Sequence, residues 1–151
     1  MMNPLKWLAS LFGRGNEPQG PLRFDVAATS DRGLVRPENE DSYLMRKEDF
    51  FLAVADGMGG GADGALASSW VCEALTGLLA TPSEGFRERV KGTGAALEAA
   101  NARVREYMKE RGIKMMGSTA AVLLADPARP ARGVIAHVGD SRIYRWRKGI
   151  G

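Results

Sequence analysis

The acidic, glycine-rich run at residues 56–60, DGMGG, is the part of this sequence best suited to chemistry. Asp56 follows a short apolar run at residues 50–55, so a rigid element would hold its carboxylate. Glycines adopt backbone conformations that other residues avoid, and they let carbonyl groups approach a ligand closely. Asp56 and the Gly57 carbonyl would offer two hard oxygen ligands, and one carboxylate can bridge two cations. An ordinary Asp-Gly hairpin turn explains the same residues without a metal.

A nucleotide site is a poor alternative for these glycines. The run matches neither G-x-G-x-x-G nor G-x-x-x-x-G-K-[ST], and no lysine follows it. We therefore set a nucleotide-phosphate cradle aside.

Two further clusters carry polar side chains suited to phosphate and metal. Residues 36–41, RPENED, contain Arg36, whose planar cation suits bidentate capture of phosphate, and the acids Glu40 and Asp41. Residues 138–142, VGDSR, place Asp140 between two apolar segments. Taken alone, the first cluster is more typical of a solvated loop and the second of a hairpin turn.

Soft metal ligands are scarce in this sequence. It has one cysteine, Cys72, and one histidine, His137, too few for a zinc site of the usual kind. Any bound metal would therefore be held mainly by oxygen, which favours Mg²⁺, Mn²⁺ or Ca²⁺. His137, in an apolar strand, and Cys72, in an apolar helix, are interpreted as structural. No internal disulfide can form, so we expect a reducing, cytoplasmic location.

Hydrophobic spacing predicts strands, then two helices, then strands again. The apolar positions of residues 70–79 fall on one helical face, and Pro82 ends that helix. A second helix is expected at about 83–111 with Gly112 as its stop, although Gly92 and Gly94 weaken its start. Residues 42–45 and 50–55 should form a hairpin, the latter strand buried on both faces. The predicted strands are 22–28, 42–45, 50–55, 118–125, 133–138 and 143–146.

The chain begins with a segment of different composition. Residues 4–12 are amphipathic and residues 13–21 resemble a linker, so we divide the 151 residues into a leader at 1–21 and a domain at 22–151. A weak signal peptide, a membrane- or partner-docking helix and a frayed leader remain alternatives for 1–21. The net charge of +3 comes from scattered basic residues, which favours a solvated surface over nucleic-acid binding.

Taken together, the clusters resemble one known family. Residues 30–41 resemble the opening motif of type 2C, or PPM, metal-dependent serine/threonine protein phosphatases. Residues 54–60 resemble the second motif in its bacterial form, 117–120 the Gly-Ser/Thr-Thr strand start, and 137–144 the next motif. The four motifs occur in the family's order and cover about residues 22–149.

The resemblance implies an α+β fold, a β-sandwich of two antiparallel sheets flanked by helices in a four-layer α-β-β-α arrangement. The chain would contain its first half or more. Asp56 would bridge two core Mn²⁺ or Mg²⁺ ions and the Gly57 carbonyl would ligate one. Glu40 and Asp41 would act near them, partly through water, and Asp140 would help bind a third ion. Arg36 would hold the substrate phosphate.

The implied reaction is hydrolysis of phosphoserine and phosphothreonine on proteins by a metal-activated water, opposing serine/threonine kinases. Implied partners are phosphorylated kinase targets or a cognate kinase, with no nucleic acid, membrane contact only through residues 4–12, and a monomer at full length. Family members usually continue past the position of Gly151 with further aspartates that complete the site. The alternative is therefore a catalytically incomplete module that binds phosphoproteins or a partner. Gly61 and Ala65 depart from the family's usual residues beside the site.

Overall fold

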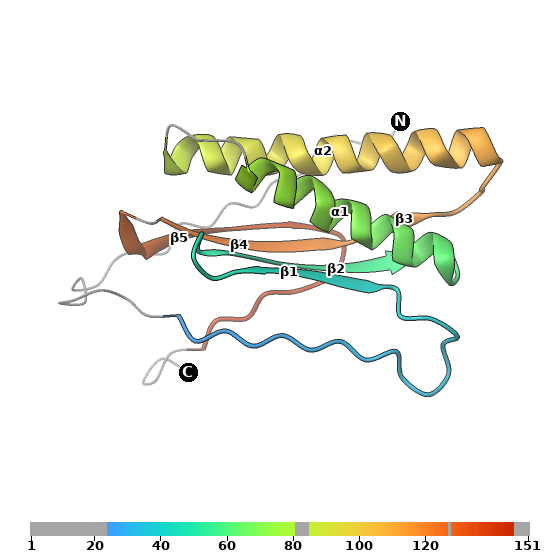
Figure 1. Cartoon of the computed structure of the whole chain (residues 1–151), viewed down its shortest axis with the longest axis horizontal. Helices are drawn as coiled ribbons and strands as arrows, with labels where there is room; N and C mark the ends of the chain where they lie inside the picture. Colours follow the sequence, from blue (N-terminus) through green and yellow to red (C-terminus); the bar gives the residue numbers. More distant parts are fainter. Residues whose placement is uncertain (1–23, 81–84, 127, 147–151) are drawn as a thin grey trace.

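One antiparallel sheet, covered on one face by two helices, forms the fold (Figure 1). The computed structural model describes residues 24–80, 85–126 and 128–146. The strands run in the order β1-β2-β4-β5, and β3 pairs with the end of β2. The elements along the chain are β1 (Asp41–Arg46), β2 (Phe51–Met58), α1 (Ala62–Ala80), α2 (Phe86–Arg111), β3 (Gly117–Ser118), β4 (Ala120–Asp126) and β5 (Arg129–Val138).

The core lies between the sheet and α1, with α2 packed on α1. Successive strand residues point to opposite faces, so every second residue of β2 is turned toward the helices. Phe51, Ala53 and Ala55 are those residues, and all three are buried. They pack with Val71, Leu75, Leu97, Ala100, Ala120, Val122, Leu124 and Ala136 in one apolar cluster. The α+β class with an antiparallel sheet and flanking helices is therefore confirmed; the described residues supply one sheet and one helical layer.

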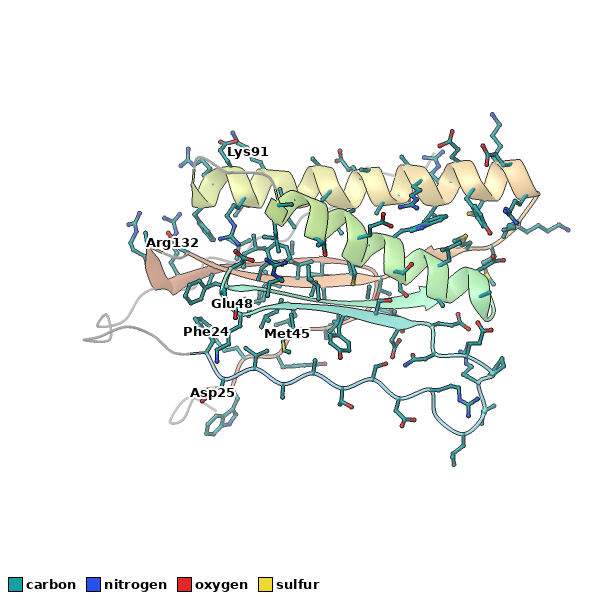
Figure 2. All side chains as sticks on the ribbon, viewed as in Figure 1. Phe24, Asp25, Met45, Glu48, Lys91 and Arg132 are labelled. Carbon is teal, nitrogen blue, oxygen red and sulfur yellow. The ribbon has the colours of Figure 1, made fainter. Side chains whose placement is uncertain are left out.

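The opposite sheet face is open at β1 and at Val54 of β2, contrary to the prediction that the strand at 50–55 is buried on both sides, although Ala121 and Ala125 of β4 are buried on that face. Val54 is 48% exposed, and it lies in register with Tyr43 of β1, which is also 48% exposed. Figure 2 shows Met45 on this same side, with Phe24 on the segment that runs below the sheet. The run is uniformly apolar, but among the described residues only one of its two faces is covered by a helix.

Two predicted strands are wrong in the described region. Residues 24–28 of the segment expected at 22–28, and all of 143–146, carry no strand pairing. Apolar alternation is present in both, but a strand also needs a neighbouring backbone to pair with. Strand β2 also continues to Met58, so Asp56 and Gly57 lie within the strand instead of in a turn after it. Strand β5 starts at Arg129, earlier than the expected 133.

Helix α2 follows the prediction closely, whereas α1 begins at Ala62, earlier than the apolar run at 70–79 indicated. Helix α2 ends at Arg111, and Gly112 adopts a left-handed φ of 65°, the expected stop. Gly92 does not break the helix, because its missing side chain makes room for Leu78 of α1; a Cβ there would overlap the leucine. Close packing between the helices thus compensates for the low helix propensity of glycine.

Within the described residues, neither helix is long and apolar enough to cross a membrane. The predicted leader at 1–21 lies outside the described residues.

The one-sided core predicts unequal effects of matched valine substitutions. Val122→Ala, at a fully buried site, should lower the free energy of unfolding by about 2 kcal/mol because it removes two methyl groups from the core. Val54→Ala, on the open face, should cost less than about 1 kcal/mol. Urea unfolding followed by circular dichroism measures both, and equal losses would contradict the one-sided core.

Candidate metal and phosphate site

The acidic residues singled out in the sequence meet at one end of the sheet. Asp41 begins β1 and is the register partner of Asp56 near the end of β2. Glu40 directly precedes β1, and Asp140 follows the end of β5. Because β1, β2 and β5 belong to one antiparallel sheet, residues far apart in sequence meet at the same end of that sheet.

The backbone of Asp56 is fixed by the β3–β4 segment. The N–H of Thr119 donates to the Asp56 carbonyl (2.8 Å), and the N–H of Asp56 donates to Oγ1 of Thr119 (3.0 Å). The Thr119 hydroxyl also shares a hydrogen bond with Oγ of Ser141 (2.7 Å). One side chain therefore ties the strand carrying Asp56 to the loop carrying Asp140.

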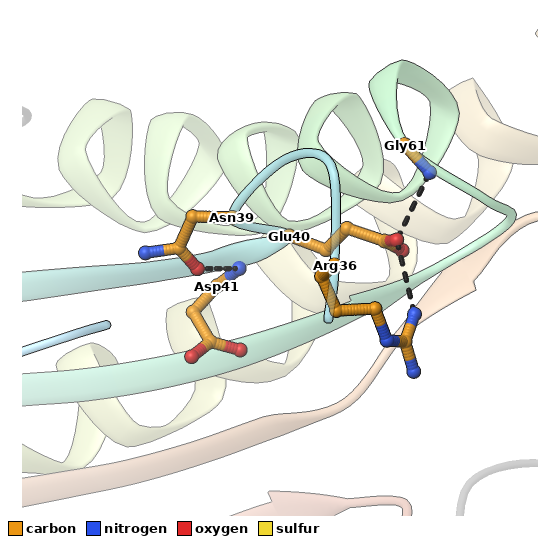
Figure 3. A network of polar contacts seen from close by, with 5 residues as sticks. All are labelled: Arg36, Asn39, Glu40, Asp41 and Gly61. Atoms are coloured by element: carbon orange, nitrogen blue, oxygen red, sulfur yellow. Dashed lines mark hydrogen bonds and ion pairs between the residues drawn. The ribbon is translucent and has the colours of Figure 1, made fainter. Parts of the chain in front are cut away.

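The Glu40 carboxylate is the buried charge of the site (Figure 3). Its Oε1 accepts from Nη1 of Arg36 (3.2 Å) and from the N–H of Gly61 (2.9 Å), just before α1. Gly61 has a φ of 66°, a backbone conformation that favours glycine. Glu40 thereby links Arg36, the cation expected to bind phosphate, to the glycine-rich loop.

Two glycines let three backbone segments converge on Glu40. The N–H of Gly57 donates to the Glu40 carbonyl (3.0 Å), and a Cβ on Gly57 would overlap the carbonyl oxygen of Gly64. A Cβ on Gly64 would overlap Oε2 of Glu40. The first turn of α1 can therefore lie directly against the carboxylate only because position 64 has no side chain.

Like charges surround Asp56. Partial burial, and next the negative charges of Asp41 and Asp140, raise the pKa of the Asp56 carboxyl above its usual 3.8; Arg36 opposes this and Glu40 adds to it. Asp56 remains accessible to solvent, so the effect is moderated by water. The other four charged side chains predicted for the site, Arg36, Glu40, Asp41 and Asp140, therefore all lie within electrostatic reach of Asp56.

The residues present fit part of an oxygen-ligand cation site. Oε2 of Glu40 is buried without a hydrogen-bond partner, and the Asp56 carboxylate sits among other carboxylates, so a cation would relieve both. Only hard oxygen donors are offered, as Mn²⁺ or Mg²⁺ requires. Within the described ranges, however, no group of three or more His, Cys, Asp or Glu side chains is arranged to hold an ion by itself.

Some residues of the site were not given a role by sequence reasoning. Thr119 lay inside a quoted motif, and Gly64 appeared only as a local departure from the family pattern. A hydroxyl directly opposite Asp56 could have been found from the antiparallel register, since 119 faces 56 in the pairing of β2 with β3 and β4. The contact of Gly64 with Glu40 depends on the angle at which α1 meets the sheet, and no local pattern encodes that angle. His137, expected to be structural, is the register partner of the buried Ala121, and its Nδ1 is itself buried.

This arrangement of fold and site defines a family. The profile of Protein phosphatase 2C matches residues 37–150, which covers Glu40, Asp56 and Asp140. The chain belongs to the protein phosphatase 2C family, as the motif resemblance predicted.

Particular relatives are bacterial phosphatases. The chain is 39% identical over 129 residues to the serine/threonine protein phosphatase PstP of Mycobacterium tuberculosis, a match covering 85% of this chain and 23% of PstP. Its fold is similar to PppA, described as a key regulatory component of T6SS in Pseudomonas aeruginosa, with a TM-score of 0.70, 30% identity, and coverage of 95% of this chain and 53% of PppA. The PstP catalytic domain in complex with two manganese ions is similar over 65% of this chain and 41% of that one, with a TM-score of 0.56 and 39% identity. The chain thus spans about a quarter of the curated relative and about half of the solved PppA chain.

The contact between Glu40 and Gly64 predicts that position 64 tolerates no added carbon. Gly64→Ala should lower the free energy of unfolding by about 1–3 kcal/mol, because the new methyl group must displace a buried carboxylate. Gly77→Ala, in the same helix, places its Cβ in open space and should raise stability by up to about 1 kcal/mol through helix propensity. Chemical denaturation of both variants measures this, and a neutral Gly64→Ala would show that the carboxylate is not confined.

The raised pKa of Asp56 predicts a pH-dependent gain in stability on its neutralisation. A carboxyl with a folded-state pKa above 3.8 contributes stability below that pH and loses it as the pH rises through the folded pKa. At neutral pH without metal, Asp56→Asn should therefore raise the melting temperature, and the gain should shrink as the pH approaches 3.8. Differential scanning calorimetry with Asp25→Asn as the charge-matched control measures this; a loss of stability at neutral pH would contradict it.

Proposed function

We propose that this chain supplies the metal- and phosphate-binding half of a Mn²⁺- or Mg²⁺-dependent phosphatase that acts on phosphoserine and phosphothreonine in proteins. The observation that carries the proposal is that one end of the sheet brings together five charged side chains, those of Asp56, Asp41, Asp140, Glu40 and Arg36. Membership of the protein phosphatase 2C family supports it.

The chain's own oxygens would hold the ions. Asp56 and the Gly57 carbonyl would hold the core ions. Asp41 and Glu40 would act near them, partly through water, and Asp140 would help hold a third. The manganese-containing PstP catalytic domain, at 39% identity, supports this choice of metal. Since the described residues do not by themselves form a closed cluster, further ligands must complete the site.

Bound cations supply a water that is deprotonated near neutral pH and offset negative charge on a phosphoryl group. Arg36 binds the phosphate oxygens of the substrate: its side chain is 69% exposed, so the guanidinium is available while one N–H is held by Glu40. The buried Glu40 orients this cation through a short ion pair whose carboxylate is itself fixed by Gly61. No side-chain nucleophile is required; burial raises the pKa of the Cys72 thiol to about 11, which keeps it protonated.

The proposed substrates are phosphorylated proteins, kinase targets or a cognate kinase, and the proposed location is the cytoplasm. The sequence has a single cysteine, Cys72, and so forms no internal disulfide, which supports a reducing compartment.

A second candidate is a phosphoprotein-binding module without catalysis, favoured by the lack of a three-carboxylate cluster in the described part of the chain. Isothermal titration calorimetry of the 151-residue chain with Mn²⁺ tests this second candidate. Tight binding of two ions contradicts the non-catalytic candidate.

Activity is best tested in a chimera. The chain would be joined to the part of the M. tuberculosis PstP catalytic domain that follows the matched region, and phosphate release from a phosphothreonine peptide would be measured with and without Mn²⁺. We expect Mn²⁺-dependent release, reduced at least about 100-fold by Asp56→Ala, because the substitution removes the bridging carboxylate.

Arg36→Ala should lower kcat/KM by about 10- to 100-fold through loss of a phosphate-binding cation, while Asp25→Ala, which removes an exposed acid outside the site, should have no effect. Release that is absent, or indifferent to Asp56→Ala, would refute the proposed function.

A further inference from the structure

The tip of the loop before Glu40 exposes two adjacent apolar side chains. Leu34 is fully exposed and Val35 is 92% exposed, the highest values among the large apolar residues described. Single exposed apolar residues are ordinary, but a turn normally favours Gly, Asn, Asp or Ser at its tip. We propose that Leu34 and Val35 form a docking element for an apolar side chain beside the phosphorylated residue of a peptide substrate. The inference rests on the proposed function and names the substrate feature that this site selects.

Hydrogen bonds fix the conformation of the loop that carries Leu34 and Val35. The N–H of Gly33 donates to Oδ1 of Asp31 (2.7 Å), and Gly33 has a φ of 73°. Nη1 of Arg32 donates to the carbonyl of Pro37 (3.1 Å), which closes the loop across its base. An apolar contact on a pre-shaped loop loses less conformational entropy on binding than one on a mobile segment.

The base of the loop is tied to the strand that carries Asp41. Nδ2 of Asn39 donates to Oγ of Ser30 (2.8 Å), and that hydroxyl donates to Oδ2 of Asp41 (3.1 Å). The N–H of Asp41 donates to Oδ1 of Asn39 (3.0 Å), as Figure 3 shows. The tip is therefore fixed relative to the acidic end of the sheet.

The spacing to Arg36 suits a residue close to the phosphate. Val35 adjoins Arg36 and Leu34 is two residues away, so their Cα atoms lie within about 7 Å of that of Arg36. An extended peptide advances by about 3.3 Å per residue. A peptide whose phosphate reaches Arg36 can thus place a side chain one to three residues away against Leu34 and Val35. A leucine or similar residue would bury apolar surface on both partners.

The surroundings of the tip favour a peptide over a lipid surface. Nη1 of Arg32 is directed to the Pro37 carbonyl, so this nearby cation points into the loop's own network. A lipid-inserting loop would instead direct its basic side chains outward to anionic headgroups.

Peptide binding to the 151-residue chain in Mn²⁺ tests the inference. Two fluorescein-labelled phosphothreonine peptides are compared by anisotropy, one with leucines on either side of the phosphothreonine and one with serines. The unaltered chain should bind the leucine peptide about 5- to 10-fold more tightly, since partial burial of one leucine corresponds to roughly that factor. The double variant Leu34→Ser, Val35→Ser should bind both peptides with the affinity of the serine peptide.

Met45→Ser, an exposed apolar residue at the far end of β1, is the matched control and should keep the preference. The melting temperature of the double variant should be unchanged, because both side chains are exposed. Equal affinities in the unaltered chain, a preference that survives in the double variant, or a marked drop in its melting temperature would each overturn the inference. Binding of the unaltered chain, but not the double variant, to phosphatidylcholine–phosphatidylserine vesicles would overturn it in favour of a membrane contact.

Failure of the proposed function has a different signature. In that case each phosphopeptide binds no more tightly than the same peptide with unphosphorylated threonine, and Arg36→Ala has no effect on binding. Phosphate-dependent binding that Arg36→Ala weakens, without a difference between the two peptides, leaves the proposed function standing and overturns only the docking element.

Discussion

The burial of the Glu40 carboxylate is the constraint on which the rest of the site depends. A charge removed from water must be compensated by partners, and Glu40 takes one from the Arg36 guanidinium and one from the Gly61 amide. These two contacts draw the loop before β1 and the loop before α1 together over the end of β2. Because the Gly57 amide also donates to the Glu40 carbonyl, the strand carrying Asp56 is fastened to the same residue. The site is therefore positioned by one buried anion and its neighbours more than by the sheet alone.

The fold could be predicted from the sequence wherever local signals decide it. Helix α2 and its end at Gly112 follow from spacing and a glycine stop, and the β1–β2 hairpin from two short apolar runs around polar residues. The strand predicted at 143–146 failed because alternation records what a strand buries and not whether a partner lies beside it. For the same reason the sequence did not reveal that, among the described residues, helices cover only one face of β2 (Figure 1).

The candidate site was predictable as a set of residues but not as an arrangement. Arg36, Glu40, Asp41, Asp56 and Asp140 were each ambiguous alone, and their order along the chain singled them out. Their effect on the pKa of Asp56 could not be predicted without two features of the fold. These are the strand register, which places Asp41 opposite Asp56, and the return of β5 to the same end of the sheet. The tie from Thr119 to Ser141 depends on two side-chain rotamers, and composition and spacing carry no information about those.

The absence of a side chain at position 64 links the evolutionary fates of two positions. Any residue larger than glycine at 64 would overlap the Glu40 carboxylate, while a smaller residue at 40 would leave space beside the first turn of α1. A lineage can therefore enlarge position 64 only after position 40 has shrunk, and regaining Glu40 would then require glycine to return first. The order of substitutions at positions 40 and 64 therefore matters. A descendant that had lost Glu40 and gained a larger residue at position 64 could not recover the buried acid by a single substitution.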